Sequence, residues 1–277
     1  MTQNFQVKIK ENNGLFREDN YLQFGTPLPV GEFFNHKELE LTTEVGQILP
    51  SVFSVTALWP DNSIKWCLIE TLVSIEAHQK QVLAVTKRIP KNDIPSDKAD
   101  FIKETDTEIV IHTKHCLFTL NKESFNFFDK IVKENDALVE RGEFIFSSRD
   151  DGRLDAKVNS FQYRSVSSAD IPMAAQVELN GEIYSKNKAL VANFQAIFKF
   201  FIATDSVKIS FTLHNPKAAS HASGLWDLGD KNSLYFNNLD LALKLKGSQQ
   251  TTQWKVEQDQ SWNTLAQSPL TIYQESS

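Results

Sequence analysis

The chain has 277 residues, of which 41% are hydrophobic and 23% are charged. These fractions are near the averages of folded soluble proteins, and the length suffices for one large β domain or two ordinary ones. The formal net charge of −6 at pH 7 gives no electrostatic basis for binding nucleic acid. Phe is heavily used, with 20 residues, and aromatic side chains favour the pleated surface of a sheet.

The cysteines and the N-terminus further narrow the class of protein that is expected. Cys67 and Cys116 lie inside apolar runs, where a reduced cysteine acts as a small hydrophobic residue; a disulfide is the alternative, and two cysteines make no metal site. The N-terminus lacks the apolar core of a signal peptide, and no apolar run has the length of a membrane span. If Met1 is native we expect a cytoplasmic protein; if a signal peptide was removed, an extracellular or periplasmic one.

The first residues predict short strands around a structured loop. Phe5 to Lys10 alternates apolar and polar residues, which is typical of a half-buried strand. The stretch Phe24-Gly-Thr-Pro-Leu-Pro-Val-Gly31 contains two prolines and two glycines, so neither a helix nor a regular strand is expected there. Leu39 and Leu41 then indicate another short strand.

The strongest hairpin signal follows. Ser51 to Trp59 and Ser63 to Val73 are both strand-like, and Pro60-Asp61-Asn62 lies between them. Proline presets the backbone at the second position of a turn, and asparagine tolerates the left-handed conformation that closes it. The pattern therefore predicts a tight turn with a positive φ at Asn62.

Trp59 and Trp66 flank this turn. One interpretation makes them two stacking platforms for sugar rings. The other makes them large rings that close one end of a barrel, and the residues alone favour this structural interpretation.

A change of composition at Ile89 to Asp100 predicts a domain boundary. This stretch has two prolines, many charges and little to bury, as expected of a linker. We therefore expect one domain over residues 1–92 and a second over residues 98–277. Strands are predicted in the second domain at Glu108–His112, Cys116–Leu120, Phe125–Val132, Glu143–Ser148, Phe161–Ser168 and Ala174–Leu179.

Two later stretches require a choice. Asn180-Gly181 is a typical hairpin pair, so we expect it to join Ala174–Leu179 to a short strand near Ile183. Ala189 to Ala203 fits both helical spacing and alternation; we predict a strand. So many short strands separated by turn signals indicate an all-β architecture of a barrel and a sandwich.

The stretch from His214 to Phe236 is the main candidate for binding. It lies between strand-like runs at Ser206–Leu213 and Ser233–Leu245 and contains two histidines, two aspartates, a tryptophan and two glycines. Loops held by rigid strands carry many binding residues, and this mixture suits a saccharide. Aspartate and glycine also make turns, so a purely structural loop with Trp226 covering the end of a sandwich is the alternative.

Three motifs resemble those of a known family. The loop Phe24–Gly31 followed by Ala57–Trp66 is similar to the "G-x-P-x-P-x-G" loop and "W-P-D-G-S-x-K-W" hairpin that open exo-rhamnogalacturonan lyase and YetA-like proteins, with Asn62 in place of a glycine. The pattern A-x-x-H-x-x-G-x-W-D-L-G-D-x-x-S within Asn215–Phe236 resembles the next domain of that family. Tyr273–Ser277 resembles the start of a further "Q-x-S-S-G" motif.

The resemblance implies an N-terminal RIFT-type β-barrel, then an antiparallel β-sandwich, and in full-length relatives a C-terminal α/α toroid. It implies an acidic plant-type polysaccharide or oligosaccharide as partner, together with the toroid. From the charge and the lengths of the apolar runs we expect neither nucleic acid nor membrane as a partner. We expect the chain to be the β region of a rhamnogalacturonan-lyase-like protein that contacts carbohydrate but is not catalytically complete alone. The alternatives are a stand-alone carbohydrate-binding module and a scaffold that docks a catalytic domain.

The reaction that the resemblance implies, β-elimination at a uronate, assigns hypothetical roles within the 214–236 loop. Elimination needs a base for the C5 proton and a group that stabilises the carboxylate. No cofactor is expected, although aspartate oxygens also suit Ca²⁺. The candidates are His221 and His214 as bases, Asn215 as a carboxylate contact, Trp226 as a stacking floor, and Asp227 and Asp230 as partners of a histidine or of Ca²⁺.

Overall fold

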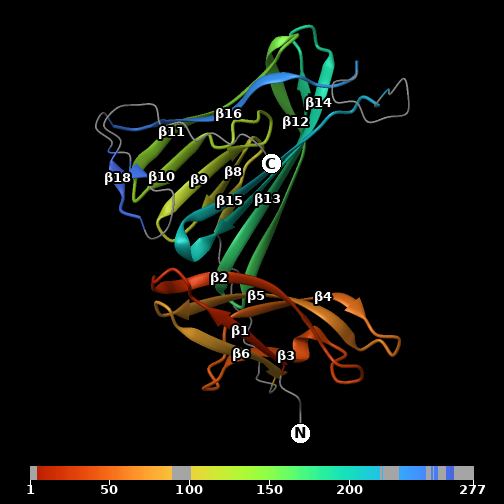
Figure 1. Ribbon diagram of the computed structural model, residues 1–277, viewed down its shortest axis with the longest axis vertical. Helices are drawn as coiled ribbons and strands as arrows, with labels where there is room; N and C mark the ends of the chain where they lie inside the picture. The colour runs from red at the N-terminus through yellow and green to blue at the C-terminus, as the bar shows by residue number, and fades with distance from the viewer. Residues whose placement is uncertain are drawn as a thin grey trace.

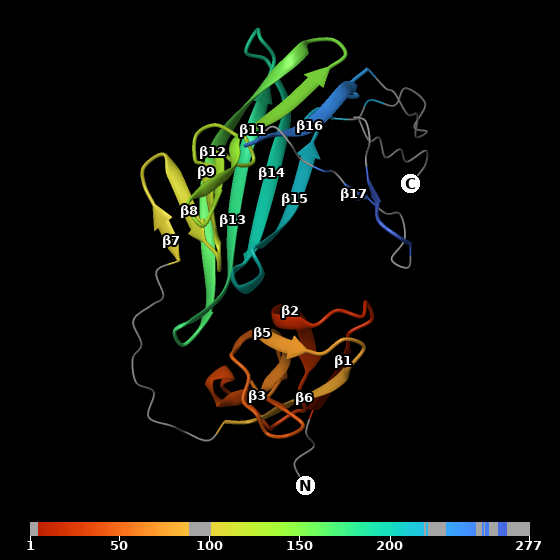
Figure 2. The same ribbon diagram turned by 90° about the vertical axis from the view of Figure 1, so that its left-hand side faces the viewer.

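The computed structural model describes residues 5–88, 101–218, 220, 231–247, 251, 253–254 and 260–264. Strands dominate this part of the chain, and within it no α-helix forms. Figures 1 and 2 show a small β unit with the N-terminus and a larger β unit built on long strands. None of the described helical turns is long and apolar enough to cross a membrane.

The first unit is a barrel made of two three-stranded antiparallel sheets, with strand orders β1-β6-β3 and β2-β5-β4. Alternate residues of each strand point into one core, which includes Leu41, Ile64, Ile69 and Leu83, each fully buried. The elements are β1 (Phe5–Lys10), β2 (Arg17–Pro27), the 3₁₀ turn η1 (His36–Glu38), β3 (Leu39–Thr43), β4 (Ser51–Leu58), β5 (Ile64–Ile75) and β6 (Lys80–Lys87).

The second unit is a ten-stranded antiparallel sheet in the order β15-β14-β13-β12-β11-β10-β9-β8-β7, with β16 paired to β11. Its elements are β7 (Ile102–Glu104), β8 (Glu108–His112), β9 (Cys116–Asn121), β10 (Lys130–Lys133), β11 (Asp136–Ser148), β12 (Gly152–Ser168), β13 (Ile171–Tyr184), β14 (Leu190–Phe201), η2 (Ile202–Thr204), β15 (Ser206–His214) and β16 (Phe236–Leu245). A short pair, β17 (Gln253–Trp254) and β18 (Asn263–Thr264), lies apart from it.

The sheet of the second unit folds over a core rich in phenylalanine. The ring of Phe125 contacts Phe144 on β11 at a centroid distance of 5.1 Å and Phe211 on β15 at 5.6 Å. Phe118 on β9 contacts Phe200 on β14 at 5.3 Å. Because these contacts join opposite ends of one sheet, the unit has the layered packing of a β-sandwich, as predicted, and the Phe-rich composition fills it.

The predicted turn at Pro60-Asp61-Asn62 is confirmed. The Asn62 N–H donates to the Trp59 carbonyl at 2.9 Å, and the Trp59 N–H donates to the Ser63 carbonyl at 2.8 Å. Asn62 has φ +66°, the left-handed conformation that asparagine tolerates.

The strand at Ala189–Ala203 is also confirmed, as β14, but the hairpin at Asn180-Gly181 was wrong. Both residues lie inside β13, and Gly181 pairs with Phe194 across the sheet. A Cβ atom on Gly181 would lie 2.2 Å from the Lys157 carbonyl oxygen and 2.5 Å from the Phe194 ring. Glycine is required there by close packing rather than by a turn.

Two other expectations have clear outcomes. Only the end of the strand predicted at Phe125–Val132 forms, as β10, and the phenylalanines before it enter the core without strand pairing. Cys67 and Cys116 are free and buried, so the disulfide alternative was wrong. Residues 89–100 lie outside the described residues, so the position of the domain boundary stays a prediction.

Glu11 fixes the open edge of the barrel with a buried carboxylate. The side chain is 3% exposed, and it accepts hydrogen bonds from four backbone N–H groups, those of Asn13, Gly14, Leu15 and His78. Burial by itself raises the pKa of Glu11, but these hydrogen bonds more than offset it and lower the pKa from 4.5 to about 2. The ionised carboxylate thus ties the β1–β2 connection to the β5–β6 turn.

The lowered pKa of Glu11 predicts an acid-sensitive barrel. Its folded-state pKa lies below the unfolded value, so its stabilisation is complete above about pH 4.5 and is lost as the pH falls towards about 2. Glu11→Gln should lower the free energy of unfolding at pH 7, and the deficit relative to wild type should shrink below pH 4.5. Urea unfolding at several pH values measures this deficit, with Glu32→Gln, at an exposed position, as the control. A deficit that does not change with pH would contradict this role.

The positive φ of Asn62 predicts the effect of replacing this residue with glycine. Asn62→Gly should be neutral or should stabilise the protein by a few tenths of a kcal/mol, because glycine has no steric penalty at positive φ. Urea unfolding tests the prediction. A destabilisation above about 1 kcal/mol, typical of a disruptive change, would show that the Asn62 side chain has another function.

Candidate functional site

A cluster of charged side chains joins the two β units. Glu70 on β5 points out of the barrel, and its side chain is 1% exposed. Its carboxylate accepts hydrogen bonds from both terminal nitrogens of Arg164 on β12, at 3.1 and 3.3 Å, and from the Tyr21 hydroxyl on β2. The Lys199 ammonium on β14 lies 3.6 Å from the same carboxylate and donates to Gln23 at 3.0 Å. The buried carboxylate is therefore neutralised by side chains of the other unit.

Apolar contacts and further hydrogen bonds surround this cluster. Leu72 of the barrel packs in one cluster with Val166, Met173 and Ala174 of the sandwich. The Ser51 N–H on β4 donates to the Ser168 hydroxyl at 3.0 Å. The junction is thus a packed interface.

The electrostatics of the cluster limit its chemistry. Burial of Glu70 raises its pKa, but hydrogen bonds from Arg164 and Tyr21 and the positive charges of Arg164 and Lys199 outweigh burial, so the pKa lies below its ordinary value. Burial and the Glu70 carboxylate raise the pKa of Tyr21 far above its usual range. A general base must be unprotonated to accept a proton. Tyr21 stays protonated at neutral pH and does not suit that role.

The outward face of the β2–β5–β4 sheet extends from this cluster to an exposed indole. Trp66, Leu68 and Glu70 alternate along β5 with residues of the barrel core. Trp66 is 43% exposed and lies about 13 Å from Glu70 along the strand. Gly25 pairs with Leu68, and a Cβ atom there would meet nothing within 4 Å. Figure 1 shows this end of the sheet, by the β4 label, extending beyond the ends of the sandwich strands.

Trp59 is held by the barrel itself. Its indole N–H donates to the Leu28 carbonyl at 2.9 Å, and the Lys65 ammonium lies 4.6 Å from the ring centroid. The Gly31 N–H donates to the Ser63 hydroxyl at 2.9 Å. The two N-terminal motifs are therefore hydrogen-bonded to each other, since the proline-rich loop docks on the turn of the hairpin.

The predicted binding loop is described at its ends. His214 is the last residue of β15 and pairs with Asn193. The Asn215 side chain donates to the Asn232 carbonyl at 2.8 Å and accepts from the Lys217 N–H at 3.1 Å. Asn215 thus closes the base of the loop. His221, Trp226, Asp227 and Asp230 lie outside the described residues, and their proposed roles stay predictions.

The structure does not bring the two predicted sets of site residues together. β15 begins beside η2, which packs against β2 of the barrel. His214 is at the opposite end of that strand, about 26 Å along it. His214 and Asn215 are thus remote from the barrel face that carries Trp66. In the described ranges no group of three or more His, Cys, Asp or Glu side chains converges to hold a metal ion.

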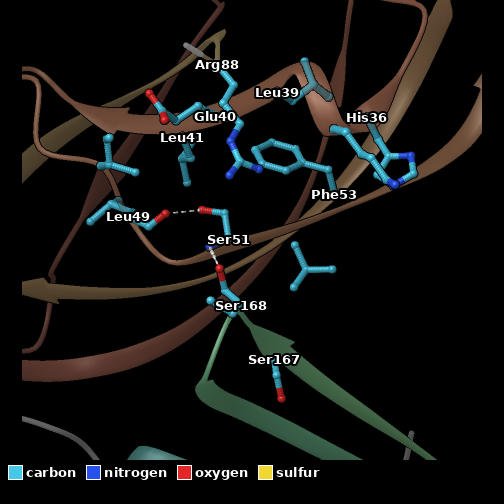
Figure 3. A pocket seen from close by; sticks show the side chains of 14 residues that line it. His36, Leu39, Glu40, Leu41, Leu49, Ser51, Phe53, Arg88, Ser167 and Ser168 are labelled. Atoms are coloured by element: carbon cyan, nitrogen blue, oxygen red, sulfur yellow. Dashed lines mark hydrogen bonds between the residues drawn. The ribbon is translucent and has the colours of Figure 1, made fainter. Parts of the chain in front are cut away.

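A pocket opens at the same junction between the barrel and the turn that joins β12 to β13. It has a volume of about 550 Å³, and Figure 3 shows its side chains. None of its lining residues was predicted as a site residue from the sequence. They come from positions 36 to 169, and no local pattern indicates that they meet.

The comparison with known families agrees with the fold of the first unit. Residues 13–87 match the family model of the PcRGLX-like N-terminal RIFT barrel domain. The match covers β2 to β6 and both N-terminal motifs, so the first unit is a RIFT barrel and the resemblance is confirmed at the level of this domain. No curated protein matches the chain.

The junction cluster had a signal in the sequence that the search for motifs missed. Glu70 is the one charge in W-C-L-I-E-T-L-V, and Lys199 is the one charge in A-I-F-K-F-F. A charge in an otherwise apolar strand must be paired or must face water. Such isolated charges are candidates for contacts between domains.

The buried position of Glu70 predicts a large effect of its removal. Glu70→Gln should lower the free energy of unfolding by about 3 kcal/mol, because the change leaves Arg164 and Lys199 without their carboxylate. Urea unfolding provides the measurement, and Glu76→Gln, at an exposed position just after the same strand, is the matched control. A loss of less than about 1 kcal/mol would show that the cluster does not stabilise the junction.

Proposed function

We propose that this chain is the barrel and sandwich region of a rhamnogalacturonan-lyase-like polysaccharide-degrading protein, and that it contacts an acidic oligosaccharide through the outward face of β2, β5 and β4. The match of residues 13–87 supports the assignment to such a protein. The single observation that carries the contact is the exposure of Trp66 on that face, beside the open space at Gly25.

The face has the groups that an acidic sugar requires. An indole offers a large rigid apolar surface, on which the apolar side of a sugar ring stacks. Arg164 lies at the inner end of the face, and its side chain is 48% exposed. A guanidinium has five N–H donors, so Arg164 retains donors for a uronate carboxylate while it binds Glu70.

The same arrangement supports the proposal that the chain alone is not a complete lyase. Elimination needs a base and a carboxylate-stabilising group placed together, and small displacements cost large factors in rate. Tyr21 beside the cations is held protonated, and His214 is at the far end of β15. We propose that the toroid domain of full-length relatives supplies the rest of the catalytic cleft.

Trp66 provides the direct test. Calorimetric titration of the whole chain with rhamnogalacturonan I oligosaccharides should show binding, and Trp66→Ala should weaken it at least tenfold, a loss of about 1.4 kcal/mol. Trp262→Ala is the control, because Trp262 is also exposed, at 60%, and lies outside this face. When the chain is incubated with the same oligosaccharides, the ultraviolet absorbance of the unsaturated uronate product should not rise.

Unchanged affinity in Trp66→Ala would contradict the assigned face. A steady rise of absorbance that His221→Ala abolishes would instead make the 214–236 loop a complete active site. Loss of binding in Trp226→Ala alone would place the contact in that loop and favour a binding module.

One observation favours a second candidate function, that of a scaffold which docks a catalytic domain. Leu241, Leu243 and Leu245 follow each other on one face of β16 and are 39%, 39% and 47% exposed. Contiguous exposed apolar side chains are typical of interaction surfaces. Absence of any saccharide binding by the wild-type chain would favour this function.

A further inference from the structure

The pocket at the junction is built by both β units. The barrel contributes η1, β3, the start of β4 and the residue after β6, and the sandwich contributes the β12–β13 turn. The lining residues are His36, Lys37, Leu39, Glu40, Leu41, Ile48, Leu49, Ser51, Val52, Phe53, Arg88, Ser167, Ser168 and Ala169. A volume of about 550 Å³ is in the range of small-molecule sites.

One wall of the pocket is apolar. Leu39, Leu41 and Leu49 are buried, with exposed fractions of 4%, 0% and 8%. Phe53 packs against the same barrel core and lines the pocket. This wall suits the body of a ring-shaped molecule, because it replaces water with apolar contact.

The polar part of the pocket is mainly cationic. Arg88 follows β6 directly, and its backbone N–H donates to the Glu38 carbonyl at 2.7 Å. In Figure 3 its guanidinium points towards Ser51 and Phe53. Lys37 lines the same pocket, and Glu40 is the one acidic residue among the described lining residues. A guanidinium binds a carboxylate with two parallel hydrogen bonds.

We propose that this pocket binds a small organic carboxylate with a ring-shaped body, of at most about disaccharide size. Arg88 binds the carboxylate, the Ser168 hydroxyl supplies a further hydrogen bond, and Phe53 with the leucines contacts the ring. A monoanion fits better than a phosphate, because a doubly charged group costs more to desolvate beside an apolar wall. Arg88 has five N–H donors, so a contact that it already makes leaves donors for the ligand.

The bound carboxylate links the barrel to the sandwich. The Ser168 hydroxyl that accepts from the Ser51 N–H is part of the pocket wall, so the site is complete only when the two units are docked. A ligand that binds only the docked form stabilises that form. The ligand should therefore raise the midpoint of thermal unfolding.

This site is separate from the face proposed above for oligosaccharides. The pocket includes Ser51 to Phe53 at the start of β4, whereas Trp66 pairs with Ala57 near its end. The two positions are about 13–20 Å apart along the strand. Trp66→Ala should therefore leave the affinity of the pocket unchanged.

Calorimetric titration of the whole chain with galacturonate, benzoate and galactose tests the proposal. The two acids separate a sugar acid from an aromatic acid, and galactose is the neutral counterpart of galacturonate. At least one acid should bind, at least tenfold more tightly than galactose, and raise the unfolding midpoint. Arg88→Gln should weaken binding of that acid at least tenfold. Lys80→Gln is the matched control, because Lys80 begins β6, about 26 Å from Arg88 along the chain.

Lys37→Gln provides a second variant, since Lys37 lies in the exposed η1 turn and its replacement does not disturb the core. This change should weaken binding of the acid several-fold. Binding of neither acid would overturn the proposal, as would galactose binding as tightly as the acid that binds best. Unchanged affinity in both Arg88→Gln and Lys37→Gln would also overturn it, whatever the outcome at Trp66.

Discussion

The burial of the Glu70 carboxylate constrains how the two β units meet. An ionised carboxylate removed from water is costly unless cations and hydrogen bonds replace its hydration. The barrel supplies Tyr21, but the two cations, Arg164 and Lys199, come from the sandwich. A shift of one strand relative to the other unit would leave the charge unpaired. We interpret the cluster as the interaction that fixes the docking position, with the apolar contacts of Leu72 adding area around it.

Both regions that we assign to ligands depend on this docking. The face that carries Trp66 ends at Arg164, and the pocket is closed by the turn after β12. Each combines barrel residues with sandwich residues far later in the chain. The barrel therefore carries most of each region, and the sandwich completes it with the Arg164 cation in one case and with the hydroxyls of Ser167 and Ser168 in the other.

Local patterns predicted most of the fold. The alternation of β14 and the turn at Asn62 are set by neighbours in sequence, so the pattern and the structure agree. Asn180-Gly181 misled because glycine serves both turns and close packing, and only the position of Phe194 and of the Lys157 carbonyl distinguishes them. The pocket could not be predicted, because Arg88 and Ser168 meet only through the docking of the two units.

The hydrogen bonds at the base of the 214–236 loop have a consequence for how this protein can change. Asn215 donates to the Asn232 carbonyl, and Asn232 donates to the Ala218 carbonyl at 2.6 Å, so the two ends of the loop are held together next to the sheet. The cost of closing a loop rises only slowly with its length. A change in the number of residues between Asn215 and Asn232 therefore adds little to the cost of closing the loop on the sandwich.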